Sequence, residues 1–235
     1  MIRVFLPMVA EASGTPKPVQ FGFALYGQPM ERHHELMAQG YRLQNWYAYA
    51  CCLENPLYMP TLRGKDSFQP IDEVARLAAQ YPARTWCLWN EPDRPTQDRT
   101  TPQDALEQTQ IWIDAIGSNG RIAGYGVGLE PGYTGWRIWL DEFLRLGGPL
   151  PDAWHIHIYA EDVPQWDELY QQWQEWNADN GNLPTIISEA GALPYEDGNQ
   201  DGRMSIYYHL RRWIDERVEA VYLYTKQPEL YVEAT

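Results

Sequence analysis

The sequence predicts an α/β protein, a compact single-domain (β/α)8 TIM barrel. Two observations lead to this prediction. Segments with strand character alternate with segments of helix character along most of the 235 residues, an order that is typical of parallel βα units. There are eight such strand segments, and a chain of this length can bury one core without a second domain.

Each expected strand is a short run rich in apolar, β-branched or aromatic residues. The eight runs are residues 19–27, 41–50, 56–64, 83–92, 121–130, 153–160, 184–192 and 218–225. The sequence shows no internal repeat, no low-complexity tract and no boundary of a second domain. We therefore expect one domain over residues 19–235.

Helices are expected between most of these strands, over residues 31–39, 71–80, from 101 onward, 136–143, 166–176 and about 204–216. The clearest of them carries Trp, Leu and Tyr residues at helical spacing along one face. Thr101 and Pro102 predict a helix start, because Thr is a good N-cap, Pro fits the first turn and Asp104 follows three residues after the cap.

The first 18 residues are expected to form an N-terminal linker or extension. Their apolar run, Val4 to Ala10, is short for a signal peptide and lacks a convincing cleavage site. The stretch EASGTPKP that follows it is typical of a flexible linker. We expect that a longer precursor is trimmed here and that the protein is secreted.

The composition limits the classes of molecule that the protein is expected to bind. A net charge of −14 argues against nucleic acid and against an anionic membrane surface, because both are bound by basic patches. No segment approaches the roughly 20 apolar residues of a membrane-spanning helix. The chain has 11 Trp and 16 Tyr but only 5 Phe. Such rings suit a wet cleft that stacks on sugars, although they also pack between helices and barrel.

Neither the cysteines nor the paired histidines form a metal-binding pattern. Cys51, Cys52 and Cys87 have no metal-ligand spacing and not the even count of a disulfide framework. We expect them to be small buried strand residues. His33 and His34 fall on the first expected helix without a metal-ligand register, so we expect them to be solvated surface residues.

One loop carries half of a calcium-binding pattern. Residues 197–202, DGNQDG, match the first six positions of a calcium loop, with oxygen ligands at Asp197, Asn199 and Asp201. The twelfth position is Tyr208, where a bidentate Glu would be required. We therefore expect a polar turn, no bound metal and no cofactor.

The active site of such a barrel lies at the carboxyl ends of the strands. The residues expected at these ends are Tyr26, Trp46, Tyr47, Arg63, Asn90, Glu91, Glu130, His157, Tyr159, Glu189 and Tyr224. Carboxylates, aromatic rings and hydrogen-bonding groups dominate this set, and it contains no cysteine and no nucleophilic serine.

Glu91 and Glu189 are the candidate catalytic residues. Hydrolysis of a glycosidic bond needs an acid that protonates the leaving oxygen and a second carboxylate that attacks the anomeric carbon or activates water. The two glutamates end the fourth and seventh expected strands, where a buried carboxylate is costly without a function. The spacing alone leaves open a catalytic pair or two salt-bridged glutamates.

Two motifs add a family resemblance. WNEPD (89–93) and ISEAG (187–191) resemble the signatures of clan A glycoside hydrolases. The resemblance implies that Glu91 is the general acid/base, that Glu189 is the nucleophile and that Asn90 contacts the sugar hydroxyl beside the reacting carbon. HIHIY is similar to the clan's sixth-strand pattern. It implies that Tyr159 orients the nucleophile and that His157 lines the cleft.

Within the clan, the sequence is most similar to glycoside hydrolase family 128. LYMPTLRG on the third expected strand and LWNEPD on the fourth resemble that family's segments, and its members cut or bind β-1,3-glucan. The sequence departs from the family at Arg63 and Tyr224, where a Trp that would floor a sugar subsite is usual. We expect at least one of Tyr26, Trp46 and Tyr224 to present its ring to the cleft.

The resemblance implies a retaining glycoside hydrolase, an endo-β-1,3-glucanase that acts by double displacement on a poly- or oligosaccharide, as a monomer. Repulsion from ionised Glu189 is expected to keep Glu91 protonated near neutrality. The two carboxyl groups are expected to lie about 5 Å apart. Glu130 either contacts the substrate or pairs with a nearby arginine.

Three other functions stay open beside this one. They are a non-catalytic glycan-binding barrel, a clan A hydrolase acting on another β-glycan, and a metal-dependent barrel enzyme. The strand ends carry no cluster of His, Asp and Lys, which argues against the last of these.

Overall fold

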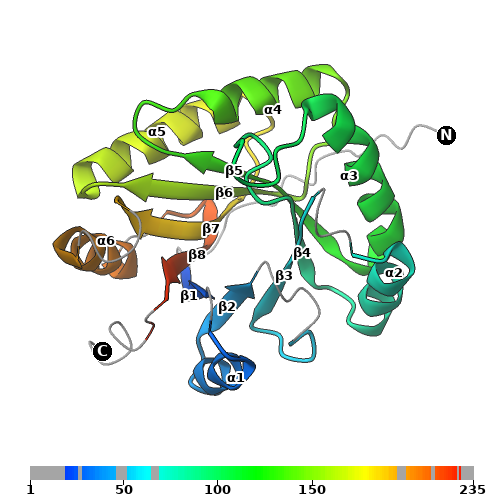
Figure 1. The fold of residues 1–235 in the computed structure, drawn as a ribbon, viewed down its shortest axis with the longest axis horizontal. Helices are drawn as coiled ribbons and strands as arrows, with labels where there is room; N and C mark the ends of the chain where they lie inside the picture. Colours follow the sequence, from blue (N-terminus) through cyan, green and yellow to red (C-terminus); the bar gives the residue numbers. More distant parts are fainter. Residues whose placement is uncertain are drawn as a thin grey trace.

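The structure of the chain, a computed structural model, describes residues 19–25, 28–45, 52–64, 69–194, 200–212, 215–226 and 228. Eight parallel strands form a closed barrel in the order of the chain, and helices lie around them (Figure 1). The strands are β1 Gln20–Leu25, β2 Arg42–Asn45, β3 Tyr58–Leu62, β4 Thr85–Leu88, β5 Arg121–Leu129, β6 Ala153–Ala160, β7 Thr185–Ala192 and β8 Val218–Thr225. The predicted (β/α)8 TIM barrel is confirmed.

Within the described residues, six α-helices and one short 3-10 helix connect these strands. They are α1 Met30–Ala38, α2 Ile71–Gln80, α3 Pro102–Ile116, η1 Gly117–Asn119, α4 Gly135–Arg145, α5 Val163–Asp179 and α6 Gln200–Arg212. α3 begins as predicted, because the Thr101 hydroxyl accepts a hydrogen bond from the Asp104 backbone N–H at 3.2 Å. α6 begins four residues earlier than the sequence predicted.

The strand bounds agree with the sequence to different degrees. β6 and β8 have the predicted bounds. β4 is much shorter than predicted, because it ends at Leu88 and the chain then turns through Trp89 and Glu91 at positive φ angles of 70° and 50°. Glu91 therefore lies in the turn that follows the strand, not at its last position.

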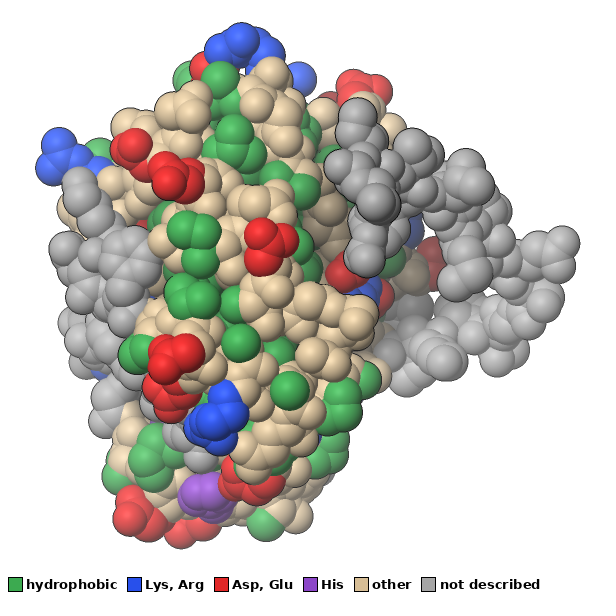
Figure 2. Space-filling model, turned by 90° about the vertical axis from the view of Figure 1, so that its right-hand side faces the viewer, with side chains coloured by type: hydrophobic (Ala, Val, Ile, Leu, Met, Phe, Trp, Pro, Cys, Tyr) green, Lys and Arg blue, Asp and Glu red, His purple; other side chains and the backbone are tan. Residues whose placement is uncertain are grey.

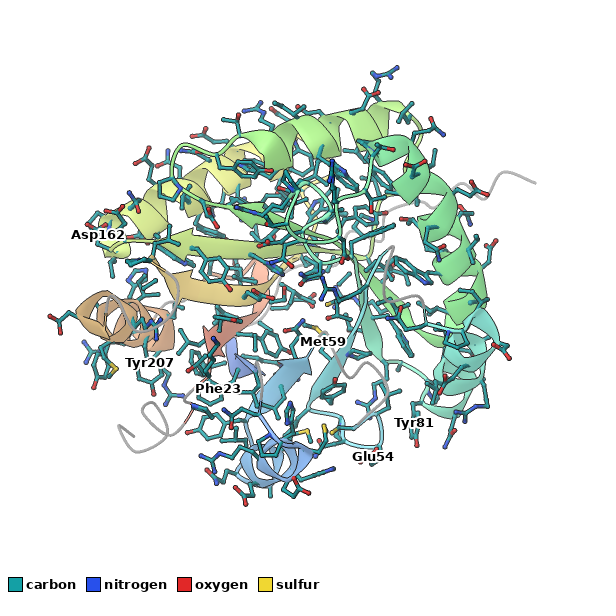
Figure 3. All side chains as sticks on the ribbon, in the orientation of Figure 1. Phe23, Glu54, Met59, Tyr81, Asp162 and Tyr207 are labelled. Atoms are coloured by element: carbon teal, nitrogen blue, oxygen red, sulfur yellow. The ribbon has the colours of Figure 1, made fainter. Side chains whose placement is uncertain are left out.

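The barrel has two cores, one inside the strands and one between strands and helices. The inner core is mostly small and consists of Ala24, Met59, Cys87, Ala123, Ala153, Ile186, Ala220 and Tyr222. Figure 3 shows Met59 within the ring of strands and Tyr207 on the surrounding helix α6. Small residues fit the narrow interior of a closed eight-stranded barrel, which side chains fill completely.

Tryptophan fills the outer core. Nine of the eleven tryptophans are buried there, at positions 86, 89, 112, 136, 139, 154, 166, 173 and 176. Trp154 of β6 meets Trp173 and Trp176 of α5 at centroid distances of 5.9 and 5.1 Å. For these nine rings the packing interpretation is therefore confirmed; the remaining two, Trp46 and Trp213, lie outside the described residues.

Two predictions about single residues need correction. His33 is fully buried, not solvated, because it shares the inner face of α1 with Leu36 and Met37. Its Nδ1 lies 3.1 Å from the Pro29 carbonyl oxygen, and burial lowers its pKa. Cys52 is buried but lies in a turn, whereas Cys87 is a buried strand residue as predicted; Cys51 lies outside the described residues.

The outer face that carries α2 and α3 has separate hydrophobic side chains among acidic and other polar groups (Figure 2). Ile71 and Ile111 are exposed there by 36% and 38%. Single exposed apolar residues are common on folded proteins and do not indicate a partner. Within the described ranges, no helix combines the length and the apolar character needed to cross a membrane.

Candidate active site

The turn after β4 positions Glu91. The Trp89 backbone N–H donates to the Leu62 carbonyl of β3 at 2.7 Å, and the Glu91 N–H donates to the Gly126 carbonyl of β5 at 2.7 Å. A non-glycine residue at positive φ costs about 1–3 kcal/mol and persists only where its surroundings hold it. Two neighbouring strands thus hold a strained backbone that carries a carboxyl group only 5% exposed.

Glu189 lies within β7, where the register to both neighbouring strands shifts. It pairs in register with His157 of β6, and Gly191 pairs with Tyr159. The Tyr159 hydroxyl donates a hydrogen bond to Glu189 Oε2 at 2.5 Å. A Cβ atom at Gly191 would lie 2.6 Å from Tyr159 Cε1, so glycine is required for the phenol ring to lie against β7. The contact expected between Tyr159 and Glu189 is present.

His157 lies between the two glutamates. Its Nδ1 is 3.0 Å from Glu91 Oε1, and its Nε2 is 3.6 Å from Glu189 Oε1. Burial lowers the pKa of His157, which favours a neutral ring with one proton. With that proton on Nδ1, the ring donates to an ionised Glu91; with it on Nε2, Nδ1 accepts from a protonated Glu91. The separation of about 5 Å between the carboxyl groups stays a prediction.

The ionisation of Glu91 is shifted toward neutral pH. Burial raises the pKa of Glu91 to about 7, against the lowering effect of Arg94. Glu130 and Asp98 raise it further. The sequence predicted repulsion from Glu189 as the cause of a protonated Glu91. The two glutamates do repel each other, but burial is the largest cause of the raised pKa of Glu91.

Burial also raises the pKa of Glu189. His157, when it is protonated, and the hydrogen bond from Tyr159 act in the opposite direction and favour the ionised carboxylate. Glu91 is the repelling group here. Burial therefore raises the pKa of both glutamates, but different groups act most strongly against this rise: Arg94 at Glu91, and His157 and Tyr159 at Glu189.

Arg94 joins Glu91 to Glu130, which follows β5. Its Nη1 lies 3.1 Å from Glu130 Oε2, and its Nε lies 3.5 Å from Glu91 Oε2. Its Nη2 donates to the Gly128 carbonyl at 3.2 Å, and the guanidinium lies 4.3 Å from the centroid of the Tyr133 ring. Of the two interpretations left open for Glu130, pairing with an arginine is confirmed.

Asp98 connects the ends of β3 and β4. Its Oδ1 accepts from Arg63 Nε and Nη2 at 3.0 and 2.9 Å. Its Oδ2 accepts from the backbone N–H groups of Gly64 and Asn90, both at 2.8 Å. The carboxylate therefore fixes two of the predicted site residues, Arg63 and Asn90, beside Glu91.

The remaining predicted site residues are placed only in part. Tyr224, near the end of β8, meets the Tyr159 ring edge-on at a centroid distance of 5.9 Å, so it lies one ring away from Glu189. Tyr26, Trp46 and Tyr47 lie outside the described residues.

Among the residues that the structure describes, no group of three or more His, Cys, Asp or Glu side chains is arranged to hold a metal ion. The calcium pattern at 197–202 is only partly described. Asp201 and Gly202 belong to the first turn of α6, whereas the sixth position of a calcium loop requires a sharp turn. This half of the pattern is therefore helix, and positions 197–199 lie outside the described residues.

Sequence reasoning missed Asp93, Arg94, Asp98 and Tyr133. All of them lie in loops after strands, where no periodicity marks a side chain as inward. One signal was present, because Asp93 and Arg94 follow Asn-Glu-Pro directly as two adjacent charges of opposite sign. Tyr133 ties this loop in place by donating to the Asp93 carbonyl at 2.8 Å.

Comparison with known proteins identifies the family of the chain. A sequence family described as the glycosyl hydrolase catalytic core matches residues 34–229 of the chain. No curated protein matches the sequence.

The barrel is similar to solved structures of glycoside hydrolase family 128. A subgroup I endo-β-1,3-glucanase from Amycolatopsis mediterranei, in complex with laminaritriose, is 18% identical with a TM-score of 0.64, over 87% of this chain and 88% of that chain. A subgroup III curdlan-specific exo-β-1,3-glucanase from Blastomyces gilchristii is 16% identical with a TM-score of 0.68, over 90% and 91%. A subgroup II endo-β-1,3-glucanase from Sorangium cellulosum is 17% identical with a TM-score of 0.59, over 87% and 86%. At these identities the likeness shows a shared fold.

Proposed function

This chain belongs to the glycosyl hydrolase catalytic core family, and we propose that it is a retaining endo-β-1,3-glucanase. The observation that carries the proposal is the pair of buried glutamates, Glu91 and Glu189, with the His157 ring between them. The substrate is proposed because similar barrels of family 128 are β-1,3-glucanases. An acidic protein suits a neutral glucan better than a polyanion.

In the first step, Glu189 attacks the anomeric carbon as the bond to the leaving oxygen breaks, and Glu91 gives its proton to that oxygen. In the second step, Glu91 takes a proton from water, the water oxygen bonds to the anomeric carbon, and the bond to Glu189 breaks. Each residue thus returns to its starting state after one turnover.

The surroundings support this division of roles. A pKa of about 7 leaves Glu91 protonated in a large fraction of molecules near neutrality, as a general acid requires, and still able to ionise as a base. Glu189 instead receives the Tyr159 hydroxyl, which stabilises an ionised carboxylate. Asn90 is proposed to contact the sugar hydroxyl next to the reacting carbon, and its Oδ1 is buried without a protein partner among the described residues.

The walls of the cleft are proposed to come from the other strand-end residues, which are Tyr26, Trp46, Arg63, Glu130, His157 and Tyr224. Arg63 donates a hydrogen bond to Asp98, and the Tyr224 ring contacts the Tyr159 ring edge-on. Both side chains are therefore fixed close to the glutamates. Because these two positions depart from the family pattern, a different β-glycan is the second candidate substrate.

A panel of polysaccharides tests the proposal. Purified protein is incubated with β-1,3-glucan, mixed-linkage glucan, β-1,4-glucan, mannan and xylan, and the products are sized over time. We expect β-1,3-glucan to be cut fastest, with oligosaccharides of mixed length appearing first. Early release of a single short product would indicate exo action. Binding without hydrolysis would identify a glycan-binding barrel and overturn the proposal.

Product stereochemistry tests the retaining mechanism. NMR spectra recorded during the first minutes of hydrolysis should show the β-anomer of the new reducing end before mutarotation. An α-anomer at the start would imply inversion and a water between the two carboxylates.

We further propose that the protein acts outside the cell as a monomer, because a polysaccharide of this kind is met there and one barrel carries both glutamates. Light scattering of the purified protein and detection of the protein in culture medium test these two points.

A further inference from the structure

The charges around Glu91 form a cluster with Arg94 at its centre. The guanidinium is bound on one side by Glu130 at 3.1 Å and by the Gly128 carbonyl at 3.2 Å. On the other side its Nε faces Glu91 Oε2 at 3.5 Å, without a hydrogen bond to any described residue. Arg94 is therefore bound closely to Glu130, whereas it lies near Glu91 without forming a hydrogen bond to it.

Two further contacts fix the guanidinium in this position. The Tyr133 ring lies under it at 4.3 Å, and Tyr133 is itself tied to the Asp93 carbonyl. Only a glycine fits at position 128 without a collision. A Cβ atom there would lie 2.7 Å from both Arg94 Nε and Glu91 Oε1. The strand thus leaves the space in which these two side chains meet.

We propose that Arg94 and Glu130 are positioning residues for Glu91: Glu130 anchors the guanidinium and offsets part of its charge, so that Glu91 can be neutral as an acid and ionised as a base. The proposal rests on the proposed function for the roles of Glu91. An unpaired arginine in contact with Glu91 would hold it ionised and remove the acid. A missing arginine would leave the ionised base without a counter-charge.

The effects of the two residues on Glu91 have opposite signs. Arg94 lowers the pKa of Glu91, and Glu130 raises it. The titratable and charged groups that face Glu91 or act on it come from its own loop and from five other elements. They are Arg94, Asp93 and Asp98 from its own loop, Arg63 after β3, Glu130 after β5, Tyr133 before α4, His157 and Tyr159 of β6, and Glu189 of β7. Removing one partner at a time therefore separates the cluster from the rest of the site.

Three variants test the proposal on the full chain, namely Glu130→Gln, Arg94→Gln and the double variant. Each is assayed on β-1,3-glucan from pH 4 to 9, and the Glu91 carboxyl is titrated by NMR with glutamate labelled at the side-chain carbon. Glu91→Gln identifies the signal. Glu219→Gln is the matched control, because Glu219 is likewise a glutamate paired with an arginine. Its Oε1 accepts from Arg121 Nη2 at 2.7 Å, and Arg121 begins β5, at the end of that strand far from Glu130.

Glu130→Gln is expected to move the basic limb of kcat/KM to lower pH by about one pH unit, and the NMR midpoint of Glu91 with it. Arg94→Gln should move both to higher pH by a similar amount, and the double variant should lie between the two. Glu219→Gln should leave both unchanged.

Shifts in the same direction for Glu130→Gln and Arg94→Gln, or no shift in either, would overturn the proposal. If Arg94→Gln does not fold, the direction of the Glu130→Gln shift decides alone. If the wild-type protein hydrolyses no glycan, the proposed function fails, and the NMR titration still tests whether the cluster sets the ionisation of Glu91.

Discussion

The surroundings of Glu91 and Glu189 differ although the two residues are equally buried, each 5% exposed. Glu91 follows β4 in a turn and lies beside charged groups, above all Arg94 and its partner Glu130. Glu189 lies within β7 and receives the hydroxyl of a neutral phenol, Tyr159. Charged neighbours allow the proton affinity of a carboxyl group to be adjusted up or down, whereas a neutral donor stabilises one state, the ionised one. These different surroundings suit the two different roles proposed for the glutamates.

The largest expected effect separates these roles chemically. Glu189→Ala should lose more than about 10⁴-fold in kcat, because no covalent intermediate can form. Glu91→Ala should lose about 10²- to 10⁴-fold on natural glucan, whose leaving group needs protonation. Azide should rescue Glu91→Ala on an aryl glycoside and give the β-glycosyl azide, and it should give the α-anomer with Glu189→Ala.

The products of both reactions are identified by NMR. Identical azide anomers from the two variants, or normal activity of Glu91→Ala on glucan, would mean that the two roles are assigned wrongly.

Tyr159→Phe tests the effect of the neutral hydrogen-bond donor on Glu189. The hydrogen bond from Tyr159 lowers the pKa of Glu189, which must be ionised to attack, so its loss should move the acidic limb of the pH profile to higher pH. A hydrogen bond to a charged group contributes about 1.5–3 kcal/mol, so kcat should fall about 10- to 100-fold. The pH dependence of kcat/KM measures both effects. A shift of the basic limb instead would show that the hydroxyl acts on Glu91.

Gly128→Ala tests how tightly Arg94 and Glu91 pack against β5. The added methyl group would collide with Arg94 and Glu91, so we expect roughly a tenfold loss of kcat from displacement of the acid. Gly124→Ala in the same strand is the control, because the nearest atom to its Cβ is at 3.5 Å, an ordinary contact. Equal activities of the two variants would argue against close packing at Gly128.

The smallest expected effect concerns stability. Glu91 has a φ of 50°, so Glu91→Gly should relieve backbone strain and remove a buried carboxyl, raising the free energy of unfolding at pH 8 by about 1 kcal/mol. Glu189→Gly should not stabilise the protein in this way, because Glu189 lies within strand β7 without a positive φ to relieve, and glycine is unfavourable in a strand. Urea denaturation of both variants at pH 8 compares them. A less stable Glu91→Gly would show that the turn is not strained.

The strand-end glutamates and their immediate strand neighbours followed from the sequence. The strand order placed His157, Tyr159 and Glu189 at the ends of β6 and β7, the family resemblance suggested the contact between Tyr159 and Glu189, and the structure brings all three together. The prediction for His33 was wrong, because its burial depends on how α1 lies on the barrel and not on the local pattern of charges.

The sequence alone determined the number and order of the βα units, because strand and helix periodicity are local properties of a few neighbouring residues. The tertiary structure alone decided which charges meet. Arg94 reaches Glu130, and Arg63 reaches Asp98, only after strands from different units lie side by side. Such contacts depend on turns at positive φ and on glycines that leave space, such as Gly128. The pattern of residues thus predicted the candidate pair, while contacts formed only in the folded barrel influence the ionisation of each member.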